Sequence, residues 1–317
     1  MKRRAFLSAA LLAGVAACSS ESEKSSEKLI FGYIADYNGA SLPAIADDQG
    51  LWAKRGLEAT LKVFTNGPLQ ITAMNAGDLD YGYIGPGAVW LPASGKAKII
   101  ALNSLGNADR VIAQAGITDL TQLRGKKIGV PEGTSGDMIL TLALKKAGLS
   151  GDDVQRVPME AATIVTAFGS GQIDAAGIWY PLLNTIKAKK PDLVELAKDA
   201  DFAAEVSFPT AFVGGNDVAA AKTAKVVQVL REAMDYRAAH PDETAALVAA
   251  LNKQTVDAVK ADAANSEMLD SATLVKYTAD GTIATWLTGM GDYFVGAGKL
   301  PSNPDPSTYY SGEGFAQ

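Results

Sequence analysis

The sequence has one cysteine and one histidine among its 317 residues. A structural zinc site takes about four cysteine or histidine ligands, and an intrachain disulfide takes two cysteines, so both are excluded. His240 precedes Pro241 in a polar stretch, which is more typical of a surface histidine at a helix end than of a catalytic imidazole. We therefore expect no metal, no cofactor and no catalytic device built on histidine.

Positive charge is also in short supply. The chain has 29 lysines and arginines against 35 aspartates and glutamates, a formal net charge of −6. Binding of nucleic acid needs a basic surface field, so no nucleic-acid partner is expected. The apolar fraction of 48% and the charged fraction of 20% are typical of a folded globular chain. At roughly 150 residues per domain, the length corresponds to about two domains.

Beyond residue 17, the sequence has no run of about eighteen apolar residues that would predict a membrane span. Residues 1–17 combine a basic start with a shorter apolar run, the pattern of a secretory signal. Small residues precede Cys18, which resembles a bacterial lipobox and predicts lipidation there; Arg3-Arg4 leaves general and twin-arginine export open. Polar residues 18–27 predict a flexible tether. We expect an exported protein, lipid-anchored to the outer face of the cell membrane, or periplasmic.

Short β-rich segments and helical patterns alternate along residues 28–215, which favours an α/β fold with largely parallel strand pairing. Strands are expected at 29–34, 59–64, 81–84, 99–105, 110–113, 126–130, 154–158, 175–179, 193–196 and 209–213. From 216 to 295 the pattern is almost entirely helical, and 301–317 is rich in Pro, Ser and Gly.

The alternation predicts two lobes joined by a two-strand hinge. One lobe is discontinuous and comprises 28–112 plus 213–317, while 113–212 form the other. Ligands of open parallel sheets bind beyond the carboxyl ends of the strands, so we expect a site in the cleft between the lobes.

Thr134 and Ser135 follow an expected strand and open a helix. The N–H groups and the positive dipole end at such a start can hold an anion. The plainer alternative is that one of the two hydroxyls caps the helix. The segment is not a P-loop, because no Gly-Lys-Ser/Thr follows at the required spacing.

Other expected strand ends carry amide, hydroxyl, acidic or aromatic residues. Each could be an ordinary turn, but together they would converge on the cleft. A carboxylate such as Asp36 or Glu160 could receive an ammonium group of the ligand, or could simply be a solvated or capping acid. These candidates are Asp36, Tyr37, Asn38, Thr65, Asn66, Gly87, Trp90, Glu160, Trp179 and Thr210.

Four segments carry a family resemblance: FGYIADYNGASLPAIADDQGLWAKRGLEATLKVF, NAGDLDYGYIGPG, LRGKKIGVPEGTSGDMILTLALKKAGL and FGSGQIDAAGIWYP. The sequence resembles the periplasmic-type substrate-binding proteins of ABC importers, in the group for taurine, alkanesulfonates, nitrate and thiamine precursors. The resemblance implies a monomeric, non-enzymatic receptor whose two lobes close over a small anion, most simply a sulfonate, and deliver it to a permease with its ATPase. The pocket residues it implies are Tyr37, Asn38, Thr65, Asn66, Gly87, Thr134, Ser135 and Trp179.

Other functions stay open on the same fold. The ligand could be a thiamine-precursor pyrimidine, nitrate or an aromatic carboxylate, with Trp90, Trp179 and Tyr37 stacking on a ring. A pyrimidine-synthase-like enzyme would need iron and a histidine donor, and the chain has a single histidine. A surface sensor or adhesin without a transporter is a third class.

Overall fold

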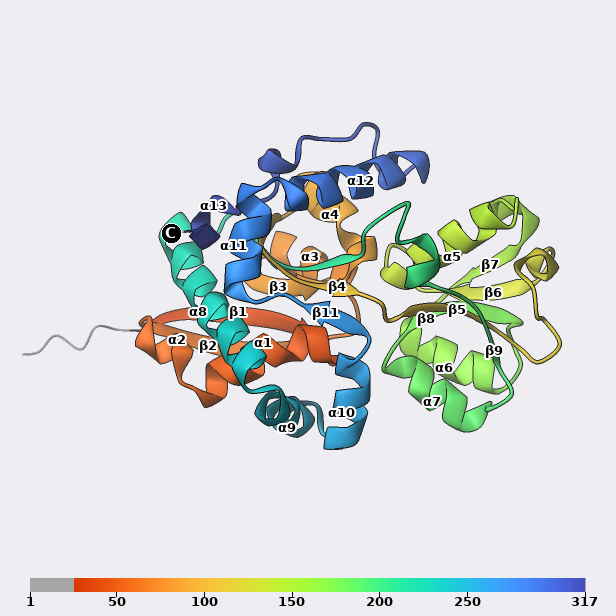
Figure 1. Ribbon diagram of the computed structural model, residues 1–317, viewed down its shortest axis with the longest axis horizontal. Helices are drawn as coiled ribbons and strands as arrows, with labels where there is room; N and C mark the ends of the chain where they lie inside the picture. The colour runs from red at the N-terminus through yellow and green to blue at the C-terminus, as the bar shows by residue number, and fades with distance from the viewer. Residues whose placement is uncertain (1–25, 317) are drawn as a thin grey trace, which may run out of the picture.

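The computed structural model describes residues 26–316, whose strands form two separate sheets in two lobes (Figure 1). The predicted signal at 1–17, the predicted lipidation at Cys18 and most of the predicted tether lie outside the described residues. Among residues 26–316, no helix has the length and apolar character that crossing a membrane requires.

The larger lobe contains a six-stranded sheet in the order β11-β4-β10-β3-β1-β2. β1 pairs in parallel with β2 and β3, whereas β10 runs antiparallel to both β3 and β4. The strands of this sheet are β1 (Glu27–Ile34), β2 (Leu57–Phe64), β3 (Tyr81–Ile84), β4 (Lys98–Gly106), β10 (Pro209–Gly214) and β11 (Ser266–Met268).

The smaller lobe contains a five-stranded sheet in the order β7-β6-β8-β5-β9. β6 pairs in parallel with β7 and β8, and β5 runs antiparallel to β8 and β9. The strands are β5 (Asp109–Ala113), β6 (Lys127–Val130), β7 (Gln155–Pro158), β8 (Ala175–Trp179) and β9 (Val194–Lys198). Both sheets are therefore mixed, not largely parallel, because the first strand after each crossing between lobes runs against its neighbours.

Helices pack on both sheets. Those of the larger lobe are α1 (Tyr37–Asp48), α2 (Leu51–Lys54), α3 (Gly67–Asn75), α4 (Trp90–Ala93), α8 (Ala220–Ala239), α9 (Pro241–Asn252), α10 (Val256–Ala263), α11 (Ser271–Ala279), α12 (Thr282–Gly296) and α13 (Glu313–Ala316). Those of the smaller lobe are α5 (Ser135–Lys146), α6 (Ala161–Gly169) and α7 (Leu182–Lys189). Short 3-10 turns are η1 (Pro86–Ala88), η2 (Leu120–Leu123), η3 (Gly151–Asp153), η4 (Asp199–Phe202) and η5 (Pro306–Thr308).

Sheet membership places the two crossings between lobes a few residues before the expected bounds. β5 belongs to the second sheet, so the first crossing lies between Gly106 and Asp109 and not at 112–113. β10 belongs to the first sheet, so the return precedes Pro209 and not 213. Each crossing segment runs directly into a strand, and hydropathy alone does not reveal which sheet that strand joins.

The C-terminal part of the chain is tied to the larger lobe. The expected helical region holds one strand that its pattern did not reveal, β11, which pairs antiparallel with β4. The Pro-, Ser- and Gly-rich tail also packs on β4, because Ile99 N–H donates to the Tyr309 carbonyl oxygen at 2.8 Å. Residues of the C-terminal part of the chain therefore pack beside β4 and belong to the larger lobe.

Candidate functional site

A small cavity lies between the lobes, at the carboxyl ends of β1, β2, β3, β6 and β8. We call it the cleft, and its lining residues are Ile34, Asp36, Asn38, Asn66, Gly67, Pro68, Tyr83, Gly85, Pro86, Ala88, Gly106, Ala108, Asp109, Thr134, Ser135, Trp179, Tyr180 and Thr210. Its volume is about 40 Å³, measured as the space open to the centres of water molecules. One water needs roughly 10–15 Å³ on this measure, so the cleft suits a small solute.

Two helices of the larger lobe begin at the cleft. Asp36 caps α1 by accepting a hydrogen bond from Gly39 N–H at 2.6 Å. Asn66 caps α3 in the same way, accepting from Leu69 N–H at 2.9 Å. Within residues 26–316, the N–H of Gly67 has no acceptor. The start of α3 therefore presents a free donor beside the cleft.

On the smaller lobe, α5 begins at the cleft without a side-chain cap. The Thr134 hydroxyl donates to the Pro131 carbonyl oxygen at 2.6 Å, so its proton is not available to a ligand. In the described part of the chain, the N–H groups of Ser135 and Gly136 have no acceptor. The expected anion donors at this helix start are thus backbone N–H groups, without the Thr134 hydroxyl, while the Ser135 hydroxyl acts on the Asp109 carboxylate.

Asn38 and Thr210, two polar residues of the cleft wall, are held from behind by a buried network. The Ser104 hydroxyl donates to Asn38 Oδ1 at 2.9 Å and lies 2.7 Å from Thr210 Oγ1. Asn103 Nδ2 donates to the Asn38 carbonyl oxygen at 3.1 Å. Arg237 in turn donates to Asn103 Oδ1 at 2.8 Å, and burial lowers the pKa of this guanidinium to about 10. The cleft wall is therefore positioned by a charge from α8.

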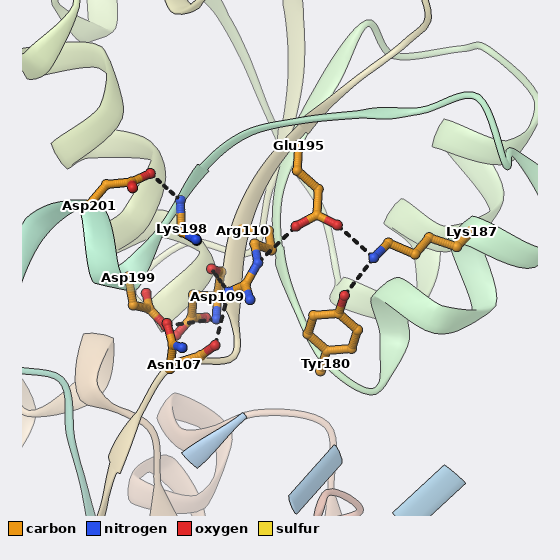
Figure 2. A network of polar contacts seen from close by, with 9 residues as sticks. All are labelled: Asn107, Asp109, Arg110, Tyr180, Lys187, Glu195, Lys198, Asp199 and Asp201. Atoms are coloured by element: carbon orange, nitrogen blue, oxygen red, sulfur yellow. Dashed lines mark hydrogen bonds and ion pairs between the residues drawn. The ribbon is translucent and has the colours of Figure 1, made fainter. Parts of the chain in front are cut away.

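Asp109 is the acidic group of the smaller lobe in the cleft. It is 3% exposed, and within the described residues its Oδ1 has no hydrogen-bond partner. Burial raises the pKa of Asp109 to about 7, while the Ser135 hydroxyl and the charge of Arg110 act in the opposite direction. Its backbone N–H donates to Asp199 Oδ2 at 2.9 Å (Figure 2).

Asp36 is the acidic group of the larger lobe in the cleft and is 7% exposed. Burial is the largest cause that raises its pKa well above the ordinary value. The charges of Asp262 and then of Asp109 add to that rise. Asp262 itself accepts a hydrogen bond from Tyr37 N–H at 2.7 Å, so it also helps to cap α1.

The lobes contact one another beside the cleft. Glu160 Oε2 accepts hydrogen bonds from Thr65 Oγ1 and Asn66 Nδ2, each at 3.2 Å. Gly87 of the larger lobe lies against the backbone of Thr134, and a Cβ at position 87 would stand 2.1 Å from the Thr134 carbonyl oxygen. These contacts join the lobes on the side of the cleft where α3 and α5 begin.

The structure brings seven of the twelve sequence-predicted ligand residues into the cleft lining. They are Asp36, Asn38, Asn66, Thr134, Ser135, Trp179 and Thr210. Thr65, Gly87 and Glu160 instead make the contacts between lobes. Tyr37 packs in a cluster with α9 and α10, and Trp90 packs below Lys96 and Lys299. Of Trp90, Trp179 and Tyr37, Trp179 alone lines the cleft, so the three residues do not stack together on one ligand ring in this structure.

Sequence reasoning missed Asp109, Tyr83 and Tyr180 as lining residues. Asp109 directly follows the first crossing between the lobes. The sequence placed this crossing about four residues later and therefore assigned Asp109 to the larger lobe, whereas it belongs to the smaller one. Tyr180 directly follows the predicted Trp179, so its position after a strand end was a usable signal. Tyr83 lies within a strand, where its orientation depends on a register that the sequence does not reveal.

Comparison with known proteins places the chain among solute-binding proteins. Residues 43–244 match the family model described as NMT1/THI5 like. A protein of Brucella abortus (strain 2308), named as a binding protein, is 50% identical over 318 residues, 99% of each chain. The taurine-binding periplasmic protein of Escherichia coli (strain K12) is 28% identical over 156 residues, 48% of this chain and 49% of that protein.

The fold also has relatives among solved structures. The alkanesulfonate-binding protein of Xanthomonas axonopodis pv. citri, bound to MOPS, superposes with a TM-score of 0.69. The alignment covers 89% of this chain and 97% of that protein at 20% identity. This likeness confirms the predicted two-lobed, periplasmic-binding-protein-like fold.

Proposed function

Because the chain belongs to the NMT1/THI5-like family, we propose that it is an exported, non-catalytic receptor that captures a small organic sulfonate and delivers it to an ABC permease. The observation that carries this proposal is that helix N–H groups without an acceptor in residues 26–316 meet at one small cleft, from the start of α3 in one lobe and of α5 in the other. Gly67 supplies one such N–H from the larger lobe, and Ser135 supplies another from the smaller lobe. A sulfonate has three acceptor oxygens that such donors can satisfy together.

Binding and closure are coupled in this arrangement. An anion held by α3 and α5 at once is contacted by both lobes, so it stabilises the closed form over the open one. The bonds from Thr65 and Asn66 to Glu160, and the Gly87 contact with Thr134, add direct contacts between the closed lobes. The permease can then distinguish loaded from empty receptor by the relative position of the lobes.

The proposal includes the cellular context read from the sequence. Removal of residues 1–17 and lipidation of Cys18 would hold a monomeric receptor at the outer face of the membrane, near its permease and ATPase. The taurine-binding relative of Escherichia coli is named as periplasmic, which supports an extracytoplasmic location. Metabolic labelling with a fatty-acid analogue, compared between the wild type and Cys18→Ser, tests the anchor.

The ligand is tested by thermal unfolding of the purified mature chain with a panel of solutes. The panel contains taurine, ethanesulfonate, nitrate, an aromatic carboxylate and a thiamine-precursor aminopyrimidine. A true ligand at about 100 times its Kd should stabilise the fold by about 2.7 kcal/mol. Stabilisation by a sulfonate supports the proposal. Stabilisation by the pyrimidine or the carboxylate alone overturns the sulfonate assignment.

A matched pair of variants locates the anion. Ser135→Asp places a negative charge at the first residue of α5, where an acid favours the helix but repels a sulfonate in the cleft. Ala220→Asp places the same charge at the first residue of α8, outside the cleft lining. Sulfonate affinity should fall at least about tenfold in the first variant, which corresponds to about 1.4 kcal/mol, and stay unchanged in the second. Equal affinities would place the anion elsewhere.

A further inference from the structure

The last turn of α12 and the segment that follows it reach from the larger lobe to the smaller one. Tyr293 Oη donates to the Met138 carbonyl oxygen at 3.4 Å, and Lys299 Nζ lies 3.5 Å from Asp137 Oδ2. Asp137 and Met138 belong to the first turn of α5, and Figure 1 shows the end of α12 on the side of the larger lobe that faces this helix. Both contacts can therefore form only while the lobes are close together.

Trp90 makes a third contact between the lobes. A Cβ at position 133 would stand 3.6 Å from Trp90 Cζ2, so the indole of the larger lobe lies against the turn that precedes α5. Lys299 Nζ lies 5.9 Å from the centre of the Trp90 ring, a distance at which a cation is attracted to the ring face. Three residues of the larger lobe thus converge on Gly133–Met138. We call Trp90, Tyr293 and Lys299 the latch.

The Asp137 carboxylate connects the latch to the start of α5. Asp137 is 5% exposed, and its Oδ2 accepts a hydrogen bond from Gly133 N–H at 2.8 Å, which fixes the turn that leads into the helix. Its Oδ1 accepts a hydrogen bond from Arg156 of the same lobe. Lys299 is therefore a second positive charge at this carboxylate, supplied by the opposite lobe. Removing it leaves Asp137 paired, so the smaller lobe can keep its fold.

The latch lies outside the cleft. The cleft lining, all of it within residues 26–316, includes none of the three latch residues and neither Asp137 nor Met138. Ser135, at the start of the same helix, does line the cleft. A contact that favours the closed form without touching the solute changes the population of that form and leaves the contacts of the solute as they were. Such a contact scales the affinity for every solute by the same factor.

We propose that the latch holds the two lobes together on the α12 side of the cleft, independently of the solute, and so sets how far the receptor is closed before a solute binds. The contacts of Tyr293 and Lys299 with α5 stabilise the closed form. The hydrogen bond from Gly133 N–H to Asp137 couples these contacts to the helix start that faces the cleft. The inference does not rest on which solute is bound.

Small-angle scattering of the purified mature chain, with no added solute, tests the latch. Lys299→Glu reverses the charge opposite Asp137, and Lys225→Glu makes the same change at an exposed ion pair with Glu27 within the larger lobe. The first variant should have a larger radius of gyration and red-shifted tryptophan emission, because opening of the lobes exposes Trp90 to water. Lys225→Glu and Lys299→Arg should both match the wild type. A wild-type scattering curve for Lys299→Glu, with a native melting curve, overturns the proposal.

Calorimetry with taurine and with ethanesulfonate distinguishes the latch from a contact with the solute. Lys299→Glu should weaken the binding of both by the same factor, at least about fivefold, and Lys225→Glu should change neither. Lys299→Gln, which removes the charge without reversing it, should give a smaller loss that is again equal for the two solutes. A loss for one solute alone would make Lys299 a ligand contact and overturn the latch. If neither sulfonate binds the wild type, the proposed function fails, while the scattering comparison still decides the latch.

Discussion

Asp199 Oδ2 accepts the backbone N–H of Asp109 at 2.9 Å, and this bond joins the two segments that cross between the lobes. Asp109 is the first residue of β5, directly after the first crossing, and Asp199 begins the segment that returns to the larger lobe. The bond thus lies at the base of the hinge, directly behind the cleft. A change in the relative position of the lobes therefore has to either keep or break this hydrogen bond.

We expect Asp199→Asn to stabilise the protein and Asp199→Ala to destabilise it. Burial, followed by the charge of Asp109, raises the pKa of Asp199 well above its ordinary value. Ionisation therefore disfavours the folded state, and stability falls as pH rises from about 4 through the folded-state pKa. Asparagine keeps the acceptor for Asp109 N–H without the charge, whereas alanine leaves that N–H unpaired.

Urea unfolding at pH 5 and pH 8 measures both effects. At pH 8 the asparagine variant should be more stable than the wild type, and the alanine variant should fall below it by about 1 kcal/mol. The gain from asparagine should shrink at pH 5. A gain that is the same at both pH values would show that ionisation of Asp199 is not its cause.

Gly87→Ala should prevent the lobes from meeting. A Cβ at position 87 would stand 2.1 Å from both the carbonyl carbon and oxygen of Thr134, which belongs to the opposite lobe. Small-angle scattering should therefore show a more open protein and ligand affinity should fall at least about tenfold. Gly85→Ala is the control for lobe position, because its Cβ would meet the Ser135 hydroxyl at an ordinary 3.7 Å. Matching scattering curves for the two variants would refute the steric argument.

Glu160 is expected to act on closure and not on the ligand. It lies outside the cleft lining, and its carboxylate accepts bonds from Thr65 and Asn66 across the lobes. Because exposed bonds of this kind contribute roughly 0.5–1 kcal/mol, Glu160→Ala should weaken binding about two- to fivefold through faster dissociation. Stopped-flow kinetics separates the rates. A loss that depends on whether the solute carries an amine would instead assign Glu160 to the ligand.

Much of the architecture follows from local patterns in the sequence. Tyr81–Ile84 and Ala175–Trp179 are short apolar runs bounded by turn residues, and both form strands with the expected bounds. The end of α5 is also set locally, because Gly148, which follows the last turn of the helix, adopts the left-handed conformation with φ of 68°. These features depend on neighbouring residues alone, so a single sequence is enough to predict them.

The missed features depend on tertiary contacts. β11 has three residues, Ser-Glu-Met, and forms a strand only because β4 lies beside it. The Thr134 hydroxyl turns to Pro131 and not to a ligand, which no spacing of residues predicts. Asp109 enters the cleft because β5 joins the second sheet, so its part in the cleft could not be found before the crossing was located.

Arg237→Lys should disturb the cleft wall from a distance. The guanidinium reaches Ser41, Asn103 and the Leu269 carbonyl oxygen at once, a planar fork that an ammonium group does not reproduce. We expect a loss of about 2–3 kcal/mol in stability and weaker ligand binding through a less fixed Asn38. Unfolding and calorimetry on the same sample check this. Lys225→Ala, at an exposed ion pair of the same helix, should change neither by more than about 1 kcal/mol.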